Sequence, residues 1–160
     1  MAGIMLDTKN FTMRTGGRTF EAAAFLRRAG ADTGVVKKVF QNDLEGTIAR
    51  YDIIQNARMY DHNIAIAAVD HEVGRVTAAQ AADELLNISG IDTSFILFQS
   101  QNTVYLSARS TSSTNVQVIL EELGGGGNAT VAGAQMPDTT LEEASRKLMT
   151  AIDKYFENEE

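Results

Sequence analysis

Beyond about residue 60, the sequence alternates short apolar runs with segments that carry helix start signals. This alternation constrains the fold more than any other feature. The apolar runs cover residues 63–69, 94–99, 103–109 and 131–136. Thr77 with Gln80 and Thr114 with Gln117 have the spacing of capping boxes, and each pair predicts a helix. Because predicted strands and helices alternate, we expect an α/β domain.

Turn signals separate the last of these elements. Ser100-Gln101-Asn102 lies between two strand-like runs and predicts a hairpin. Pro137-Asp138 predicts a turn after the final strand. Thr140 is a suitable N-cap for a C-terminal helix that we expect to reach about Tyr155.

Residues 1–60 have a different sequence pattern, which predicts mainly helices. The apolar run 3–6 reads as the end of a buried strand. Helices are predicted over Thr19–Ala29, from Asp32 or Thr33 to Phe40, and from about Leu44 to Met59. We therefore divide the chain near Tyr60, with a helical segment over 1–60 and a compact α/β domain over 61–160.

Composition and charge exclude several classes of function. The chain has no cysteine and two histidines, which removes thiolate catalysis, zinc–cysteine sites and iron–sulfur clusters. The net charge is −7, and residues 59–160 alone carry five basic and fifteen acidic side chains. This acidic half disfavours long duplex nucleic acid but allows a small anionic ligand. With no membrane-length apolar run or signal peptide, we expect a soluble, intracellular protein.

The tract Gly124-Gly125-Gly126-Gly127 is the most unusual local feature. It lies between a predicted helix and a predicted strand. One interpretation is a loop whose backbone N–H groups approach a phosphate closely. The other is a flexible linker, since the spacing fits neither the Rossmann nor the P-loop motif.

Two further positions are candidates for ligand contacts. Arg109, followed by Ser110 and Asn115, ends a predicted strand where other cations are scarce, which favours an anion or base contact. The alternative is a surface ion pair with a nearby glutamate. Asp7 follows an apolar run, as a metal-binding carboxylate can, but a carboxylate in this position is more often a loop or capping residue.

These residues together resemble the DHH-associated domain of the DHH phosphoesterase superfamily. The resemblance rests on Arg109-Ser110, Asn115-Val116, the glycine tract with Asn128, and Ala132-Gly133. The segments 2–11 and 18–23 resemble GdpP-type cyclic di-AMP phosphodiesterases. The resemblance implies a mixed β-sheet flanked by helices, with a substrate-binding domain over 61–160 and the end of a DHH domain over 1–60.

The resemblance also implies a metal and a larger enzyme. Asp7 corresponds to a ligand of a manganese pair, and the other ligands would lie in an upstream DHH domain. The chain would then be the C-terminal third or less of a membrane-anchored enzyme, with this part facing the cytoplasm. No catalytic residue is expected within it. Where the family has a histidine, this sequence has Asn128, which cannot become cationic.

The resemblance further implies substrate contacts at Arg109, Ser110, Asn115, Gly124–Gly127 and Asn128. Our first hypothesis is the substrate-binding part of a manganese-dependent phosphodiesterase that hydrolyses cyclic di-AMP or short adenylate dinucleotides. The chain alone should be inactive. A related nanoRNase or exopolyphosphatase is one alternative, and a nucleic-acid-binding accessory domain is another. A purely structural module also remains open, as does a homodimer.

Overall fold

The computed structural model describes residues 1–41, 43–111 and 113–158, and it divides the chain into two compact units. The first unit is Met1–Asp43 and the second is Leu44–Glu160. The second unit therefore begins before the division that we predicted near Tyr60, because an additional helix and strand pack with the domain. None of the helices in the described ranges is long and apolar enough to cross a bilayer.

The first unit contains three helices: α1 (Ala2–Asp7), α2 (Gly17–Arg28) and α3 (Thr33–Val39). Two predicted helices are confirmed, and Asp32 caps α3 by accepting hydrogen bonds from the N–H groups of Gly34 and Val35. The strand predicted over residues 3–6 is wrong, since these residues lie in α1. A helix satisfies backbone groups within the segment, whereas a strand needs a neighbouring strand.

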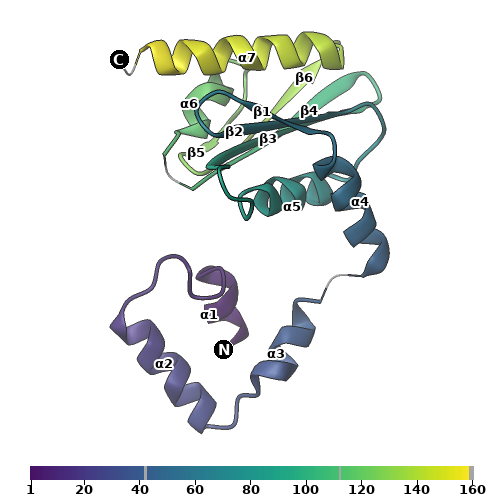
Figure 1. The fold of residues 1–160 in the computed structure, drawn as a ribbon. Coiled ribbons are helices and arrows are strands. Elements are labelled where there is room, and N and C mark those ends of the chain that lie inside the picture. The colour runs from purple at the N-terminus through teal and green to yellow at the C-terminus, as the bar shows by residue number, and fades with distance from the viewer. Residues whose placement is uncertain (42, 112, 159–160) are drawn as a thin grey trace. The chain divides into compact units, whose positions relative to one another are not determined.

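The second unit is built on a six-stranded sheet in the order β1-β2-β3-β4-β6-β5 (Figure 1). The strands are β1 (Ala57–Tyr60), β2 (Ile64–Val69), β3 (Thr93–Ser100), β4 (Thr103–Ser110), β5 (Gly126–Asn128) and β6 (Val131–Pro137). Strands β2 and β3 are parallel and every other neighbouring pair is antiparallel. The expected mixed α/β sheet is confirmed, as is the β3–β4 hairpin.

Two edge strands were missed in the sequence. Helix α4 (Leu44–Ile54) ends earlier than predicted, and β1 follows it and pairs with β2. At the other edge, the end of the glycine tract forms β5 and pairs with β6. Both strands are stabilised by backbone hydrogen bonds to a neighbouring strand. This stabilisation depends on the tertiary structure, so local sequence patterns do not reveal it.

Helices cover the two faces of the sheet unequally. Helices α6 (Val116–Glu121) and α7 (Leu141–Glu157) pack on one face, over a buried cluster that includes Phe95, Leu120 and Leu148. Helices α4 and α5 (Arg75–Leu85) pack on the other face, over a cluster that includes Ile53 and Ile96. The buried side chain of Arg50 ties α4 to α5 by donating to Gln80 Oε1 at 3.2 Å.

The N-cap residues of two helices differ from those that the sequence predicts, and the N-cap of a third is as predicted. Helix α5 begins after Gly74, so Thr77 lies inside its first turn. Helix α6 is capped by Asn115, whose Oδ1 accepts from the N–H of Gln117, and not by Thr114. The cap of α7 is the predicted Thr140, whose Oγ1 accepts from the N–H of Glu143 at 3.2 Å.

Candidate functional site

The α5 side of the sheet is open over its β6–β5 half. Along β4, side chains alternate between the two faces, so Tyr105, Ser107 and Arg109 point toward the α5 side. Helix α5 packs against β3 and β4. The β6 residues that face the same side, Val131, Gly133 and Gln135, are exposed.

Strand register arranges this open face in three rows. Directly paired residues of antiparallel strands point to the same face, and successive rows on one face lie about 7 Å apart. The Arg109 row runs Arg109–Val131–Asn128, the glycine row runs Ser107–Gly133–Gly126, and the Tyr105 row runs Phe98–Tyr105–Gln135. The middle row contributes two positions without side chains, so it forms a flat floor between two rows that bear polar groups.

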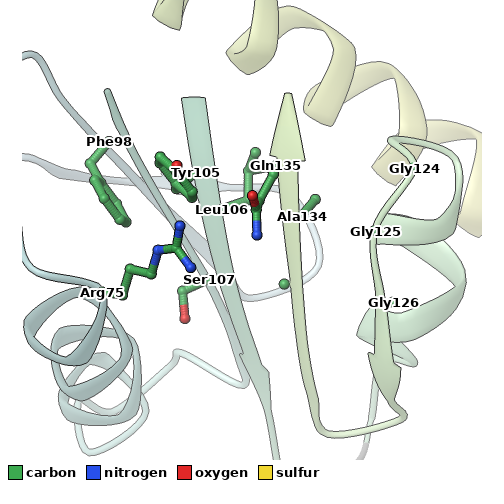
Figure 2. Close-up of a pocket in the computed structure, with 11 residues that line it drawn as sticks. Arg75, Phe98, Tyr105, Leu106, Ser107, Gly124, Gly125, Gly126, Ala134 and Gln135 are labelled. Atoms are coloured by element: carbon green, nitrogen blue, oxygen red, sulfur yellow. The ribbon is translucent and has the colours of Figure 1, made fainter. Parts of the chain in front are cut away.

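A cavity of about 500 Å³ lies over the glycine and Tyr105 rows (Figure 2). Arg75 from the start of α5 borders it on one side, and Gly124, Gly125 and Gly126 border it on the other. This volume falls within the range of small-molecule sites. The cavity therefore has room for a ligand of nucleotide size at the open half of the sheet.

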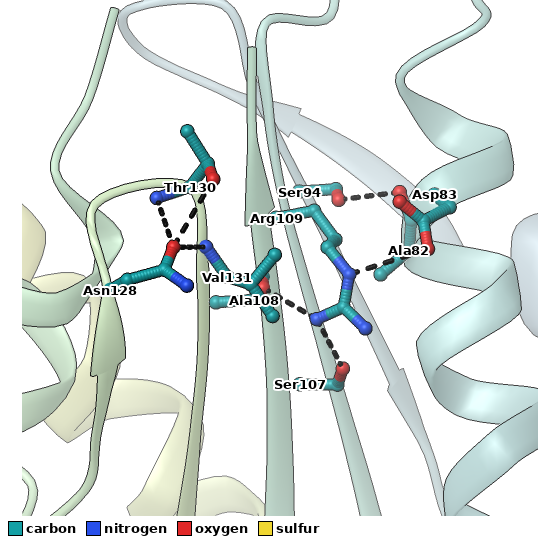
Figure 3. A network of polar contacts seen from close by, with 9 residues as sticks. All are labelled: Ala82, Asp83, Ser94, Ser107, Ala108, Arg109, Asn128, Thr130 and Val131. Atoms are coloured by element: carbon teal, nitrogen blue, oxygen red, sulfur yellow. Dashed lines mark hydrogen bonds and ion pairs between the residues drawn. The ribbon is translucent and has the colours of Figure 1, made fainter. Parts of the chain in front are cut away.

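Arg109 is held in place by the protein but keeps donors for a ligand (Figure 3). Its Nε pairs with Asp83 Oδ2 at 3.3 Å, and its Nη1 donates to the carbonyl of Ala108 at 2.8 Å and more weakly to Ser107 Oγ. The side chain is 13% exposed. Within the described residues, its Nη2 makes no hydrogen bond, so a pre-oriented guanidinium faces the open side.

Asn128 shapes the tight turn between β5 and β6. Its Oδ1 accepts from the N–H and hydroxyl of Thr130 and from the N–H of Val131, at 3.0 to 3.2 Å. In the part of the chain that the structure describes, its Nδ2 has no acceptor (Figure 3). The amide is thus a fixed neutral donor in the same row as Arg109.

The four glycines have different steric roles. A Cβ on Gly125 would lie 2.5 Å from the carbonyl oxygen of Gly133 and 2.6 Å from Ala134 Cβ. Gly127 has φ +155° and would also clash with β6, and Gly124 has φ +73°. A Cβ on Gly126 would meet nothing within 4 Å. Close packing on β6 therefore explains Gly125 and Gly127, whereas Gly126 simply leaves the floor of the cavity bare.

Two predicted contact residues lie on the other face. Ser110 is buried, and its Oγ interacts with Thr93 Oγ1 and accepts from the N–H of Thr114. Asn115 caps α6, and its N–H donates a hydrogen bond to the Tyr155 hydroxyl oxygen. Their role as ligand contacts stays a prediction. The register brings together Arg109, Asn128 and Gly126, but it does not bring these two residues to them.

Asp7 is an exposed residue at the end of α1, in the first unit. The described residues include no group of three or more histidine or acidic side chains placed to hold a metal ion. A single carboxylate cannot satisfy a pair of divalent cations. The donor set within the described chain therefore does not fit a manganese pair by itself.

Arg75 was missed in the sequence, although a signal was present. It occupies the first position of α5, where the positive end of the helix dipole disfavours a cation. Its guanidinium carbon lies 4.4 Å from the centroid of the Tyr105 ring. A basic residue at an unfavourable helix position, in an acidic domain, is a reason to look for a ligand.

Comparisons with known proteins agree with the fold. Residues 61–158 match the DHHA1 domain family. The cyclic-di-AMP phosphodiesterase GdpP of Geobacillus thermodenitrificans is 48% identical over 160 residues, which cover 98% of this chain and 24% of that protein. The cyclic-di-AMP phosphodiesterase PdeA of Listeria monocytogenes is 43% identical over 162 residues, covering 99% of this chain and 25% of that protein.

A solved structure extends the likeness to the fold of most of the chain. An exopolyphosphatase-related protein from Bacteroides fragilis superposes with a TM-score of 0.84 and 21% identity, over 95% of this chain and 48% of that one. This chain spans about a quarter of the length of the two phosphodiesterases. It belongs to the DHHA1 domain family, as its resemblance to DHH-associated domains predicts.

Proposed function

We propose that this chain is the substrate-binding part of a manganese-dependent phosphodiesterase that hydrolyses cyclic di-AMP to linear products. The observation that carries the proposal is the Arg109 row, where Arg109 Nη2 and Asn128 Nδ2 keep free donors on one face within the described residues. Two relatives match this chain over nearly its whole length, and their names support the choice of substrate.

In this proposal the Arg109 row holds a phosphate of the substrate. The pairing with Asp83 fixes the guanidinium in advance, so little side-chain entropy is lost when an anion binds. A charge-assisted hydrogen bond from Arg109 contributes about 1.5–3 kcal/mol, and the neutral Asn128 amide contributes less. The bare glycine row lets the ribose-phosphate backbone lie close to the sheet.

Manganese would supply the activated water and stabilise charge at the phosphorus. The described residues do not provide its full ligand set, so the proposal assigns one ligand to Asp7 and the remaining ligands to a DHH domain. The chain's own task is then to hold the substrate in position. We also propose that this enzyme is membrane-anchored, with this part in the cytoplasm.

The test compares hydrolysis of cyclic di-AMP by this chain and by a polypeptide that carries a DHH domain joined to it, both with manganese. We expect turnover by the longer polypeptide only, abolished by a chelator. Turnover by the chain alone would contradict the assigned division of labour. Binding of a single-stranded oligonucleotide in preference to cyclic di-AMP, at two salt concentrations, would favour the nucleic-acid alternative instead.

A further inference from the structure

A stack of three flat groups lines one end of the cavity. The rings of Phe98 and Tyr105, paired across β3 and β4, stack with centroids 5.4 Å apart and planes 18° from parallel. The guanidinium of Arg75 lies over the Tyr105 ring, 4.4 Å from its centroid. Figure 2 shows the Arg75 side chain reaching from α5 to this ring. The Phe98 ring is buried at 2% exposure, so the stack has a rigid inner end.

The fold alone does not account for Arg75. A cation at the first position of a helix is disfavoured by the helix dipole. In the described part of the chain, the Arg75 side chain forms no ion pair and no hydrogen bond, and its one specific contact is the ring of Tyr105. It is exposed and borders the cavity. The outer face and the N–H edges of the guanidinium are therefore available to a ligand.

The sheet surface beside the stack offers a selective polar group in the same cavity. Gln135 pairs with Tyr105 across β4 and β6 and is exposed, and its side-chain amide makes no hydrogen bond among the described residues. Its amide carries both donors and an acceptor, the combination that matches the edge of adenine. Figure 2 shows its amide end directed into the cavity.

We infer that this end of the cavity is a nucleobase subsite. An adenine ring stacks on the Arg75 guanidinium, which Tyr105 and Phe98 support from behind, and the Gln135 amide hydrogen-bonds the edge of the base. The inference rests on the proposed function, because it names the part of a dinucleotide that binds there. The Tyr105 row is two rows, about 14 Å, from the Arg109 row. A phosphate at Arg109 and a base at Arg75 can thus belong to one extended ligand across the glycine floor.

The chemistry of the stack favours a base over a second phosphate. A planar guanidinium on an aromatic ring presents a flat face on which a nucleobase can stack, as bases do on aromatic and arginine side chains in nucleic-acid-binding proteins. A phosphate site would instead need several converging charged donors, and Arg75 is the one cationic side chain in the cavity lining that the structure describes. Replacing arginine by lysine separates the two ligand classes, because lysine keeps the charge and loses the plane.

The experiment measures Kd by calorimetric titration of AMP, ribose 5-phosphate and cyclic di-AMP into this chain. The variants are Arg75→Ala, Arg75→Lys, Tyr105→Leu, and Arg58→Ala as a control. Arg58 is an exposed arginine on β1 at the opposite edge of the sheet. We expect AMP to bind at least tenfold more tightly than ribose 5-phosphate, and both Arg75 variants and Tyr105→Leu to weaken AMP about tenfold. Arg58→Ala should match the parent.

Gln135→Leu gives an independent readout of base identity. It should reduce the preference for AMP over GMP about tenfold while the fold remains intact by circular dichroism. Equal binding of AMP and ribose 5-phosphate, or recovery of binding by Arg75→Lys, would overturn the base subsite and indicate a phosphate contact. Cyclic di-AMP binding that is unaffected in all Arg75 and Tyr105 variants would overturn it and leave the proposed function standing. Failure of the parent to bind any of the ligands would overturn both.

Discussion

Two neighbouring glycines provide a matched pair of substitutions that separates packing from ligand contact. In Gly125→Ala, the new methyl group would lie 2.5 Å from the Gly133 carbonyl oxygen and 2.6 Å from Ala134 Cβ, and both belong to β6. Backbone of an adjacent strand cannot move aside cheaply, so we expect a loss of about 1–3 kcal/mol of unfolding free energy. At roughly 4 °C for each kcal/mol, Tm should fall by about 4–12 °C.

Gly126→Ala places the same methyl group in open space, since nothing lies within 4 Å of it and the residue already lies in β5. Its unfolding free energy should change by no more than about 0.5 kcal/mol. The methyl group would, however, cover part of the cavity floor where we place the sugar-phosphate backbone. We therefore expect kcat/KM for cyclic di-AMP to fall at least tenfold, about 1.4 kcal/mol, in the polypeptide that includes the DHH domain.

The assay is a thermal melt of both variants with steady-state kinetics of the longer polypeptide. The reasoning is refuted by either of two results. One is a Gly126→Ala variant as unstable as Gly125→Ala, which would mean that the floor is packed. The other is a stable Gly126→Ala variant with unchanged kcat/KM, which would mean that the substrate does not approach the glycine row.

Three further predictions concern side chains. Arg109→Ala should weaken substrate binding by about 1.5–3 kcal/mol, whereas Asp83→Ala removes the same ion pair and should lower Tm with a much smaller change in KM. Asn128→His should raise kcat/KM relative to the parent below about pH 6.5, where imidazole becomes charged, and superimposed pH profiles would contradict a phosphate contact there. The hydrogen bond to Asp153 raises the pKa of Tyr60 to about 12, so Tyr60 favours folding below pH 10 and loses that contribution between pH 10 and 12. Tyr60→Phe should flatten this part of the stability curve in alkaline urea melts.

Local signals in the sequence correctly predict the helices and the hairpin that have recognisable capping or turn residues at their ends. The cap at Thr140, the two-residue connection at Gln101-Asn102 and the cap at Asp32 all lie where the sequence indicates. Strand β1 was missed because its turn uses positive φ at His62 and Asn63 without a glycine. Nothing in residues 57–60 distinguishes a strand from a continuing helix until β2 is present to pair with them.

The candidate site was predictable only in part, for a related reason. Arg109 and Asn128 could be singled out by residue type and by resemblance to a family. Their alignment across β4, β6 and β5 depends on strand register, and the glycine tract has no side-chain pattern that reveals it as a strand. Arg75 lies far from the glycine tract in the sequence, and only the packing of α5 beside β4 brings it to the cavity.

The most direct test of the central claim is to map where cyclic di-AMP binds on this chain by amide chemical-shift perturbation. The account predicts that the shifts concentrate on the open face, at the amides of Gly126 and Gly133 and the neighbouring residues of β4. A second hollow, of about 350 Å³ between the end of α6 and helix α7 and lined by Leu123 and Thr150, serves as an internal control and should remain silent. Shifts confined to the α6–α7 hollow, with the glycine row unaffected at saturating ligand, would contradict the account.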